Sequence, residues 1–309
     1  MKILFISSNL IGDSILSTGL LSYLYKKNND INITLVTGPT AKQLFDNFPN
    51  IEKIIVVKKR KFNFHWLVLW FQLIGHKWDL IVDLRSSFLS YILFTKKRKI
   101  YLKNNKPISQ VEKFSNFMNS DNILIPKIYI SRPELDKAKL IIKDRVTIAI
   151  SPGGNWLPKI WPAENYNKLI FELQKKYSNK NLFFLIVGST EEEKKYFDQV
   201  VNNVPKEYII NIMGKSLTLT YACLSLCKLF IGNDSGLMHL SAASGINTIG
   251  LFGPTRDDLY GPYGKNCYVI RTKENFKDLR NSIKNFKKSS MTSILIDDLT
   301  KFIERKNII

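Results

Sequence analysis

This sequence is poor in cysteine, and the few cysteines it has are badly spaced for cross-links or metal binding. They are Cys223, Cys227 and Cys267, an odd number without a Cys-x-x-Cys pair. This argues against both a disulfide framework and a cysteine zinc site. Cys223 and Cys227 lie four residues apart in a predicted helix, where we expect them simply to pack.

Long apolar runs are also missing. No run approaches the ~20 residues that a membrane-spanning helix needs. The N-terminus enters a strand pattern at once, over Met1–Ile6, and Asn9 and Asp13 then interrupt it, so it does not resemble a cleaved signal peptide. We therefore expect a cytoplasmic protein.

Acidic residues are scarce relative to basic ones. The 309 residues include 26 Asp and Glu against 46 Lys and Arg, a formal net charge of +20. Such an excess favours an anionic partner, which is a phosphorylated substrate, an acidic membrane surface or nucleic acid. The basic clusters Lys58–Lys61, Lys96–Lys99 and Lys287-Lys288 fit solvated faces equally well when each is taken alone. Because no RNA- or DNA-binding motif accompanies the charge, we do not expect a nucleic-acid partner.

Two common phosphate-binding signatures are absent as well. No Gly-Lys-Ser/Thr follows the glycines of Ser151–Asn155, so this loop is not a Walker loop. No Asp-x-Asp pair is placed to hold a divalent ion, and the adjacent pairs Asp257-Asp258 and Asp297-Asp298 suit surface or capping positions better. We expect neither a metal site nor a cofactor.

What the sequence does contain is an alternation of strands and helices. Strands that are buried on both faces and alternate with helices predict α/β domains with doubly wound parallel sheets. The predicted strands are Lys2–Ser7, Asn32–Thr37, Lys53–Val57, Leu80–Leu84, Lys99–Leu102, Thr147–Ser151, Leu182–Val187, Tyr208–Asn211, Leu229–Gly232 and Thr248–Phe252. The predicted helices include Ser14–Lys27, Pro133–Asp144, Ala163–Lys176, Thr190–Val200 and Leu217–Leu226. A domain boundary is expected near residue 144.

The most informative stretch is Gly232–Leu240, between a predicted strand and the small residues Ser241–Ser244 of a predicted helix. A strand, a small polar turn and a helix start form a ready anion site, because the first helical N–H groups lack partners within the helix. The alternative is that Asp234 or Ser235 merely caps the helix.

Two further segments follow predicted strands. In Asn9–Ser14, Gly12 permits a tight turn and the carboxylate of Asp13 either caps a helix or serves as a general base. In Ser151–Asn155 the glycines offer backbone N–H groups, and the nearby Lys159 offers a charge for a phosphate.

These motifs occur in an order that resembles a known enzyme family. Gly12-Asp13-Ser14, Lys159–Asn165 and Gly232–Leu240 are followed by Leu251–Thr255 and Gly261–Gly264. Together they resemble the family 9 glycosyltransferases, the lipopolysaccharide heptosyltransferases, and the run Asn233–Leu240 is the specific part. The resemblance covers nearly the whole chain, loosely over residues 40–145 and tightly in the second half.

The resemblance implies a GT-B fold, in which two Rossmann-like domains face a central cleft. Residues 1–144 would form the N-terminal acceptor-binding domain and residues 145–309 the C-terminal nucleotide-sugar-binding domain, with the last helix packed on either. The implied reaction is an inverting, metal-independent transfer of a heptose from an ADP-activated donor to a lipid-linked inner-core saccharide of lipopolysaccharide.

The resemblance also assigns roles to residues. The base falls on Asp13, between Gly12 and Ser14, and the phosphate-binding lysine that stabilises the leaving group falls on Lys159. The other donor-binding positions assigned in this way are Gly154, Asn155, Glu191, Ser216, Leu217, Asp234, Ser235, Gly236, Leu237, Met238 and His239. The alternatives are a GT-B transferase that uses another nucleotide sugar and a non-catalytic nucleotide- or anion-binding module.

The apolar segment Phe62–Ile74 has two interpretations. It is too short to span a bilayer. It predicts either a core helix of the first domain or an interfacial helix that, with Lys58–Lys61 and Lys77, holds the protein on the anionic inner-membrane surface.

Overall fold

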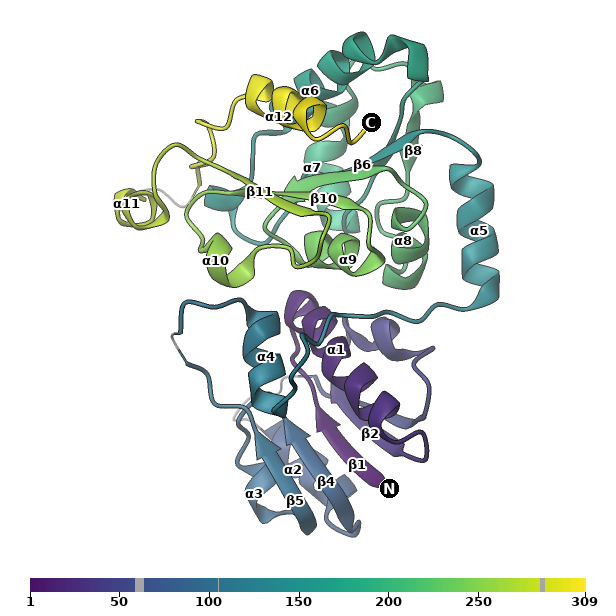
Figure 1. The fold of residues 1–309 in the computed structure, drawn as a ribbon, viewed down its shortest axis with the longest axis vertical. Helices are drawn as coiled ribbons and strands as arrows, with labels where there is room; N and C mark the ends of the chain where they lie inside the picture. The colour runs from purple at the N-terminus through teal and green to yellow at the C-terminus, as the bar shows by residue number, and fades with distance from the viewer. Residues whose placement is uncertain (59–63, 105, 284–286) are drawn as a thin grey trace. The chain divides into compact units, whose positions relative to one another are not determined.

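The chain divides into two compact units, each built on its own parallel sheet. The computed structural model describes residues 1–58, 64–104, 106–283 and 287–309, and its units are Met1–Tyr129 and Ile130–Ile309 (Figure 1). The division precedes the boundary expected near residue 144 because helix α5 (Arg132–Ile142) packs against α8 (Leu217–Leu224) of the second unit. Glu134 of α5 also accepts a hydrogen bond from the Thr218 hydroxyl.

The first unit is a five-stranded sheet in the order β3-β2-β1-β4-β5, with every neighbouring pair parallel. Its elements in chain order are β1 (Lys2–Ile6), α1 (Ile11–Lys27), β2 (Asn32–Thr37), η1 (Lys42–Phe45), β3 (Ile51–Val56), α2 (Phe64–Leu73), β4 (Trp78–Asp83), α3 (Leu89–Ile92), β5 (Thr95–Ile100) and α4 (Gln110–Met118).

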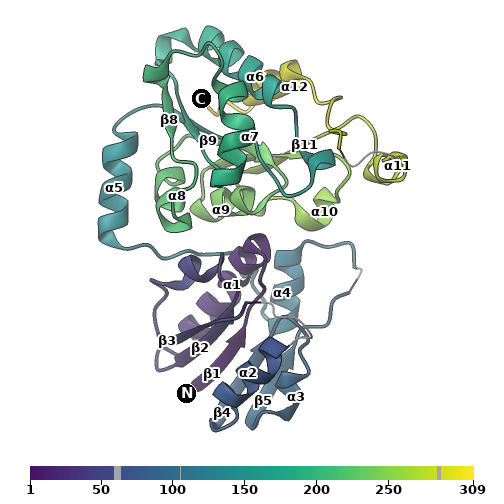
Figure 2. The same ribbon diagram turned by 180° about the vertical axis from the view of Figure 1, so that it is seen from behind.

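Helices cover both faces of this sheet. The helices α1 and α4 pack against each other. The helices α2 and α3 pack together on sheet residues such as Leu4 and Ile81, through Leu69, Leu73 and Leu89, all at most 4% exposed (Figure 2). A Cβ at Gly19 of α1 would come within 2.1 Å of the Leu124 carbonyl oxygen, so that helix admits a close backbone neighbour only because the residue is glycine.

The second unit is a six-stranded parallel sheet in the order β11-β10-β9-β6-β7-β8. Its remaining elements are β6 (Thr147–Ser151), η3 (Leu157–Lys159), α6 (Ala163–Lys176), η4 (Ser178–Lys180), β7 (Phe183–Ile186), α7 (Thr190–Val201), η5 (Lys206–Tyr208), β8 (Ile209–Asn211), β9 (Leu229–Asn233), α9 (Gly236–Ser244), β10 (Asn247–Phe252), α10 (Asp257–Tyr260), β11 (Cys267–Arg271), α11 (Phe276–Ser282) and α12 (Ile296–Arg305).

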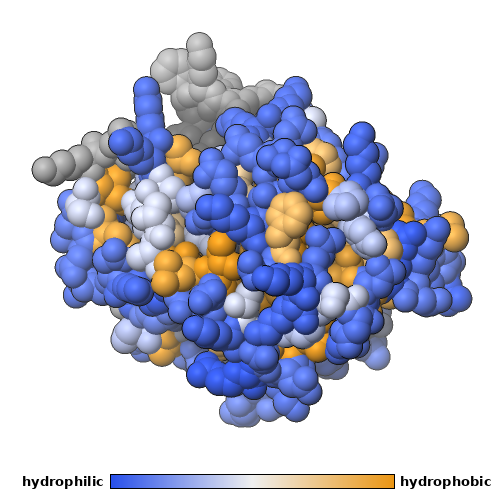
Figure 3. All heavy atoms as spheres, turned by 90° about the horizontal axis from the view of Figure 1, so that it is seen from above, coloured by the Kyte–Doolittle hydropathy of each residue, from blue (hydrophilic) through white to orange (hydrophobic). Residues whose placement is uncertain are grey.

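The last helix belongs to the second unit. Leu299 and Ile303 of α12 are fully buried in the core of that unit, and α12 packs against α6. Of the two arrangements expected for the last helix, its packing here is within its own domain. The molecular face drawn in Figure 3 is mostly hydrophilic, with its hydrophobic side chains in small separate groups.

The prediction of doubly wound α/β domains is confirmed, with differences at the edges. The strand expected at Lys99–Leu102 begins at Thr95, so the basic cluster Lys96–Lys99 forms edge strand β5. Lysines on an edge strand oppose pairing with another chain. Strand β11 and helix α4 were not anticipated. Cys227 lies beyond the end of α8, where its thiol donates to the Cys223 carbonyl at 3.3 Å.

Helix α2 of the apolar segment is buried on one side and exposed on the other. Leu69 and Leu73 are 1% exposed in the core, whereas Phe71 is 66% and Leu67 46% exposed. The residues 59–63 of the basic cluster and segment lie outside the described ranges. Within those ranges, none of the helices is both long and apolar enough to cross a membrane.

Candidate functional site

In the first unit, Asp13 lies in the first turn of α1, directly after the carboxyl end of β1. The Ser8 hydroxyl donates to its Oδ2 at 3.3 Å, and the Ser14 hydroxyl donates to the Ser8 carbonyl at 2.9 Å. The N-cap of α1 is Leu10, and no side-chain cap hydrogen bond is described there. The capping role considered for Asp13 therefore has no support in its described contacts.

Gly12 does not form the tight turn that was expected of it. It is the second residue of α1 and adopts no positive φ. Because glycine has no side chain, it leaves the space next to Asp13 free.

In the second unit, two sequence-predicted residues meet at the carboxyl edge of the sheet. The Lys159 Nζ lies 3.3 Å from Asp234 Oδ2, and the two side chains are 13% and 10% exposed. Lys159 ends the 3-10 helix η3, whereas Asp234 follows β9. The pair therefore brings a cation and a carboxylate, 75 residues apart in the chain, to one largely buried position.

Asn233, which the sequence analysis quoted within the family-like run but gave no role of its own, connects these loops. Its Oδ1 accepts from the Trp161 backbone N–H at 2.9 Å and the Tyr166 hydroxyl at 3.0 Å, and its Nδ2 donates to the carbonyls of Pro152 and Gly153, each at 3.0 Å. The side chain is fully buried, and these bonds use its full amide capacity. Burial raises the pKa of Tyr166 well above its usual value, so that hydroxyl stays a donor.

The helix start after Asp234 is left open. Ser235 is the N-cap of α9, yet no side-chain cap hydrogen bond is described there. Its Oγ is buried and has no hydrogen-bond partner among the described residues. The first N–H groups of α9 and this hydroxyl can thus accept an anion, as the sequence predicted for this turn.

The neighbouring positions divide into packing and surface positions. Met238 is fully buried, and a Cβ on Gly250 would come within 2.5 Å of its sulfur. His239 is 6% exposed. Gly236 and Leu237, like Gly154, are half-buried, and Asn155 is exposed. Met238 is thus a core residue of α9 here.

Glu191, where an acidic donor contact was expected, and its neighbour Glu192 lie at the start of α7. Glu191 is exposed, whereas Glu192 forms a capping box with Ser189 and lies so close to Gly153 that a Cβ there would meet it at 2.3 Å. Ser216, just before Leu217, accepts from the Leu219 N–H at 3.2 Å as the cap of α8. Glu192 is therefore the acidic side chain that lies against the glycine loop.

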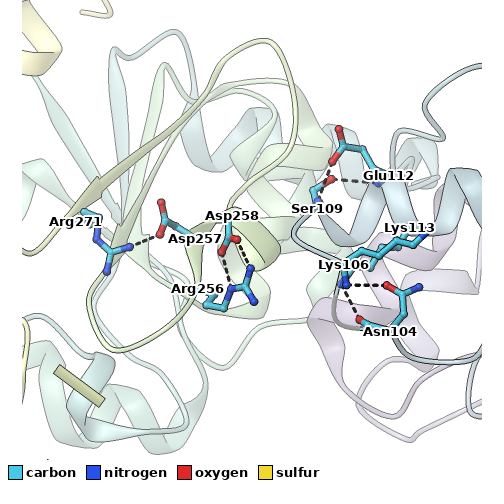
Figure 4. Close-up of polar contacts among 9 residues, drawn as sticks. All are labelled: Asn104, Lys106, Ser109, Glu112, Lys113, Arg256, Asp257, Asp258 and Arg271. Carbon is cyan, nitrogen blue, oxygen red and sulfur yellow. Dashed lines mark hydrogen bonds and ion pairs between the residues drawn. The ribbon is translucent and has the colours of Figure 1, made fainter. Parts of the chain in front are cut away.

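Of the adjacent acidic pairs Asp257-Asp258 and Asp297-Asp298, three carboxylates lie against basic side chains. Asp257 pairs with Arg271 and Asp258 with Arg256 (Figure 4), and Asp297 lies 3.6 Å from Lys301. In the part of the chain that the structure describes, no group of three or more His, Cys, Asp or Glu side chains could hold a metal ion.

Comparison with known proteins identifies the family. A family model described as "Glycosyltransferase family 9 (heptosyltransferase)" matches residues 111–289, more than half of the chain. The chain belongs to glycosyltransferase family 9. The expected resemblance is thereby confirmed, and family membership makes this an enzyme of the heptosyltransferase type instead of a binding module.

Individual members of the family resemble the chain over most of its length. Lipooligosaccharide heptosyltransferase 2 of Campylobacter jejuni serotype O:2 is 28% identical over 278 residues, which are 85% of this chain and 84% of that protein. The crystal structure of a family 9 glycosyltransferase from Veillonella parvula has a TM-score of 0.82 at 21% identity, over 98% of this chain and 96% of that one.

A third similar protein is the E. coli ADP-heptose lps heptosyltransferase II, with a TM-score of 0.77 at 19% identity, over 99% of this chain and all of that one. These solved structures bear on the fold alone, and they confirm the GT-B class of this family 9 enzyme. The sequence segments Lys159–Asn165 and Gly232–Leu240, on which the resemblance was based, contain Lys159 and Asp234.

Proposed function

We propose that this family 9 enzyme transfers a heptose from ADP-heptose to an inner-core saccharide of lipopolysaccharide. The names of its relatives support this donor and acceptor. The observation that carries the proposal is the Lys159–Asp234 pair at 3.3 Å, beside the open start of α9. It combines a cation and free N–H groups, which a nucleoside diphosphate needs, with a carboxylate that suits sugar hydroxyls.

The leaving diphosphate gains negative charge as the bond to the anomeric carbon breaks. Lys159 and the N–H groups at the start of α9 stabilise that charge, so the transfer requires no metal ion. Asp234 orients Lys159 and accepts from hydroxyl groups of the donor. Asn233 holds both loops in register through its four hydrogen bonds.

Asp13 is the general base of the proposed reaction. It takes the proton from an acceptor hydroxyl, and the oxygen attacks the anomeric carbon as the carbon–oxygen bond to the diphosphate breaks. Attack opposite the leaving group inverts the anomeric configuration. The first unit accordingly binds the acceptor and the second unit the donor.

Product analysis tests this proposal. Incubation with ADP-heptose and an inner-core acceptor should yield ADP and a glycoside whose anomeric configuration, read by NMR, is inverted relative to the donor. A parallel thermal-unfolding screen of ADP-, UDP- and GDP-sugars should show the largest protection with ADP-heptose. Transfer from a UDP- or GDP-sugar alone would support the alternative of another GT-B transferase.

We also propose that the enzyme works in the cytoplasm, attached peripherally to the inner membrane. The supporting feature is the outer surface of α2 and α3, where Phe71 and Phe88 are 66% and 77% exposed and Tyr91 is 55% exposed. The two helices lie side by side through a shared core (Figures 1 and 2). Exposed aromatic rings match the chemistry of a lipid surface, and the net charge of +20 favours an anionic one.

A further inference from the structure

Arg85 stands at the point of the first sheet where ligands usually bind. From β1 the chain builds β2 and β3 on one side, and it resumes with β4 and β5 on the other. Strands β1 and β4 are paired neighbours, so the order reverses between them. In doubly wound sheets, ligands bind at the carboxyl ends of strands at such a reversal. Arg85 follows the carboxyl end of β4, and Asp13 follows that of β1.

The guanidinium of Arg85 is held from two sides. It stacks over the ring of Trp66, 4.6 Å from the centroid, and its Nη1 donates to Asn9 Oδ1 at 3.3 Å. Its backbone N–H donates to Asp83 at 2.7 Å. Stacking and an amide contact fix the plane of the guanidinium. A guanidinium held in this way can donate two hydrogen bonds to a carboxylate or a phosphate.

The charge of Arg85 has no ion-pair partner in the described chain. None of the salt bridges there involves it. The nearby Asp83 is fully buried, and its oxygens accept from Arg85 N–H, Ser87 and Ser90. Burial lowers the pKa of Arg85, and the Asp83 charge opposes that shift. The described direct contacts of the half-buried guanidinium are an amide oxygen and an aromatic ring. The Asp83 charge is nearby, but its carboxylate is engaged by Ser87 and Ser90, so the guanidinium can still take an anion from outside the chain.

The base and the guanidinium share one loop. Ser8 donates to Asp13, and the next residue, Asn9, accepts from Arg85. The loop after β4 also contacts the chain that follows β5, because the Ser86 hydroxyl donates to the carbonyl of Tyr101 at 2.6 Å. Tyr101 also lines a pocket of about 220 Å³ together with Lys106 and Lys113. The adjacent residues Ser8 and Asn9 thus connect Arg85 with the proposed base.

We infer that Arg85 binds an anionic group, a carboxylate or a phosphate, of the acceptor and thereby positions the attacking hydroxyl at Asp13. The inference rests on the proposed function, since it concerns the acceptor of that same reaction. It adds a requirement that the proposed function does not contain, namely that the acceptor is recognised through its negative charge.

The test compares Arg85 variants on three acceptors: the native inner-core saccharide, its carboxyl-reduced form and its dephosphorylated form. Arg85→Gln should lower kcat/KM for the native acceptor by about 10- to 100-fold, the usual range for losing a charge-assisted contact. The donor KM should stay unchanged, and Arg85→Lys should recover part of the loss. The loss should shrink to about twofold on the form whose missing group Arg85 binds, which tells carboxylate from phosphate.

Arg145→Gln is the matched control. Arg145 also stacks on a ring, 4.4 Å from the Phe183 centroid, but at the amino end of β6, and its variant should retain wild-type kinetics. Wild-type kcat/KM in Arg85→Gln, or an equal loss on all three acceptors, would overturn the inference. Failure of the proposed function differs from both, because the wild-type enzyme would then form no heptosyl product at all.

Discussion

At the scale of single residues, the carboxylate of Asp13 is the group whose loss should matter most for the chemistry. Asp13→Asn keeps the size of the side chain but cannot take a proton, so we expect kcat to fall by about 10²–10⁴-fold. The donor KM should hardly change. Because the described hydrogen bond of Asp13 comes from Ser8 and not from a helix N–H, the unfolding temperature should also be nearly unchanged. Initial rates and thermal melts measure both.

Asp46→Asn is the matched control for this variant. Asp46 lies in the same unit and makes an exposed ion pair with Lys42, so its variant should keep the wild-type kcat. Near-wild-type turnover by Asp13→Asn would remove Asp13 from the role of base.

The loss of Lys159 should affect the donor, whereas the loss of Asp13 affects the step at the acceptor. Lys159→Ala removes the cation that faces the leaving diphosphate, and we expect kcat/KM for the donor to fall about 10- to 100-fold. It also leaves Asp234, only 10% exposed, without its partner, so the free energy of unfolding should drop by roughly 1–3 kcal/mol. Lys176→Ala, which breaks the surface pair with Glu304, controls for loss of a lysine. A donor KM and kcat equal to wild type would contradict the assignment.

At the scale of elements, the outer surface of α2 and α3 should decide membrane attachment. The enzyme should co-sediment with anionic vesicles at low salt and be released at high salt, because salt screens the attraction between its basic side chains and the anionic lipid headgroups. Phe71→Ser combined with Phe88→Ser should reduce binding, as should neutralising the sequence cluster Lys58–Lys61. Phe171→Ser, an exposed phenylalanine on α6, is the control. Recovery in the supernatant with and without vesicles would leave α2 as a core helix only.

The end of α8 should make the second unit sensitive to alkali. Burial raises the pKa of the Cys223 thiol to about 12 and that of Cys227 still further, whereas an unfolded thiol titrates near about 8.5. The folded state therefore keeps the thiol protons up to a higher pH than the unfolded state does. The stabilisation is complete below about pH 8.5 and declines above it, by up to about 1.4 kcal/mol per pH unit for each thiol.

Denaturant unfolding at pH 7.5 and pH 10.5 measures this decline. Cys227→Ala should lose less stability between the two pH values than the wild type, because one titrating thiol is gone. Cys267→Ala offers a comparison at β11, where burial also raises the thiol pKa to about 12. An identical decline in wild type and Cys227→Ala would show that this thiol does not contribute.

At the scale of the whole molecule, transfer should be independent of metal ions. Because the charge of the leaving group is assigned to Lys159 and the start of α9, EDTA should leave kcat unchanged, and added Mg²⁺ should not raise it. A chelator titration with a stopped assay checks this. Strict dependence on Mg²⁺ or Mn²⁺ would contradict the proposed mechanism.

Most of the fold follows from the sequence because buried parallel strands leave a strong apolar pattern. The strands at Asn32–Thr37 and Thr147–Ser151 and the helix at Ala163–Lys176 begin and end where the pattern predicts. The pattern fails at the sheet edges. Strand β11 is half-buried along its whole length, and β5 opens with lysines, so neither carries the apolar run that marks a central strand.

The candidate site is only partly readable from the sequence. The strand-end motifs located Lys159 and Asp234, since both follow turns after buried strands. Asn233 belongs to the run that carried the resemblance, but its role was not predicted. A single asparagine after a strand is typical of any turn, and its role depends on partners as distant in the chain as Trp161. Arg85 was missed for a similar reason: its aromatic and amide neighbours come from α2 and the β1–α1 loop.

The two sheets repeat one strand order, with a sixth strand added to the second. Each unit closes its own hydrophobic core, while the chemistry sits on loops at strand ends. In evolutionary terms, the half proposed to bind the acceptor can diverge without repacking the half proposed to bind the donor. Descendants with a new acceptor should therefore keep the second unit nearly intact and concentrate their changes in the loops after β1, β4 and β5.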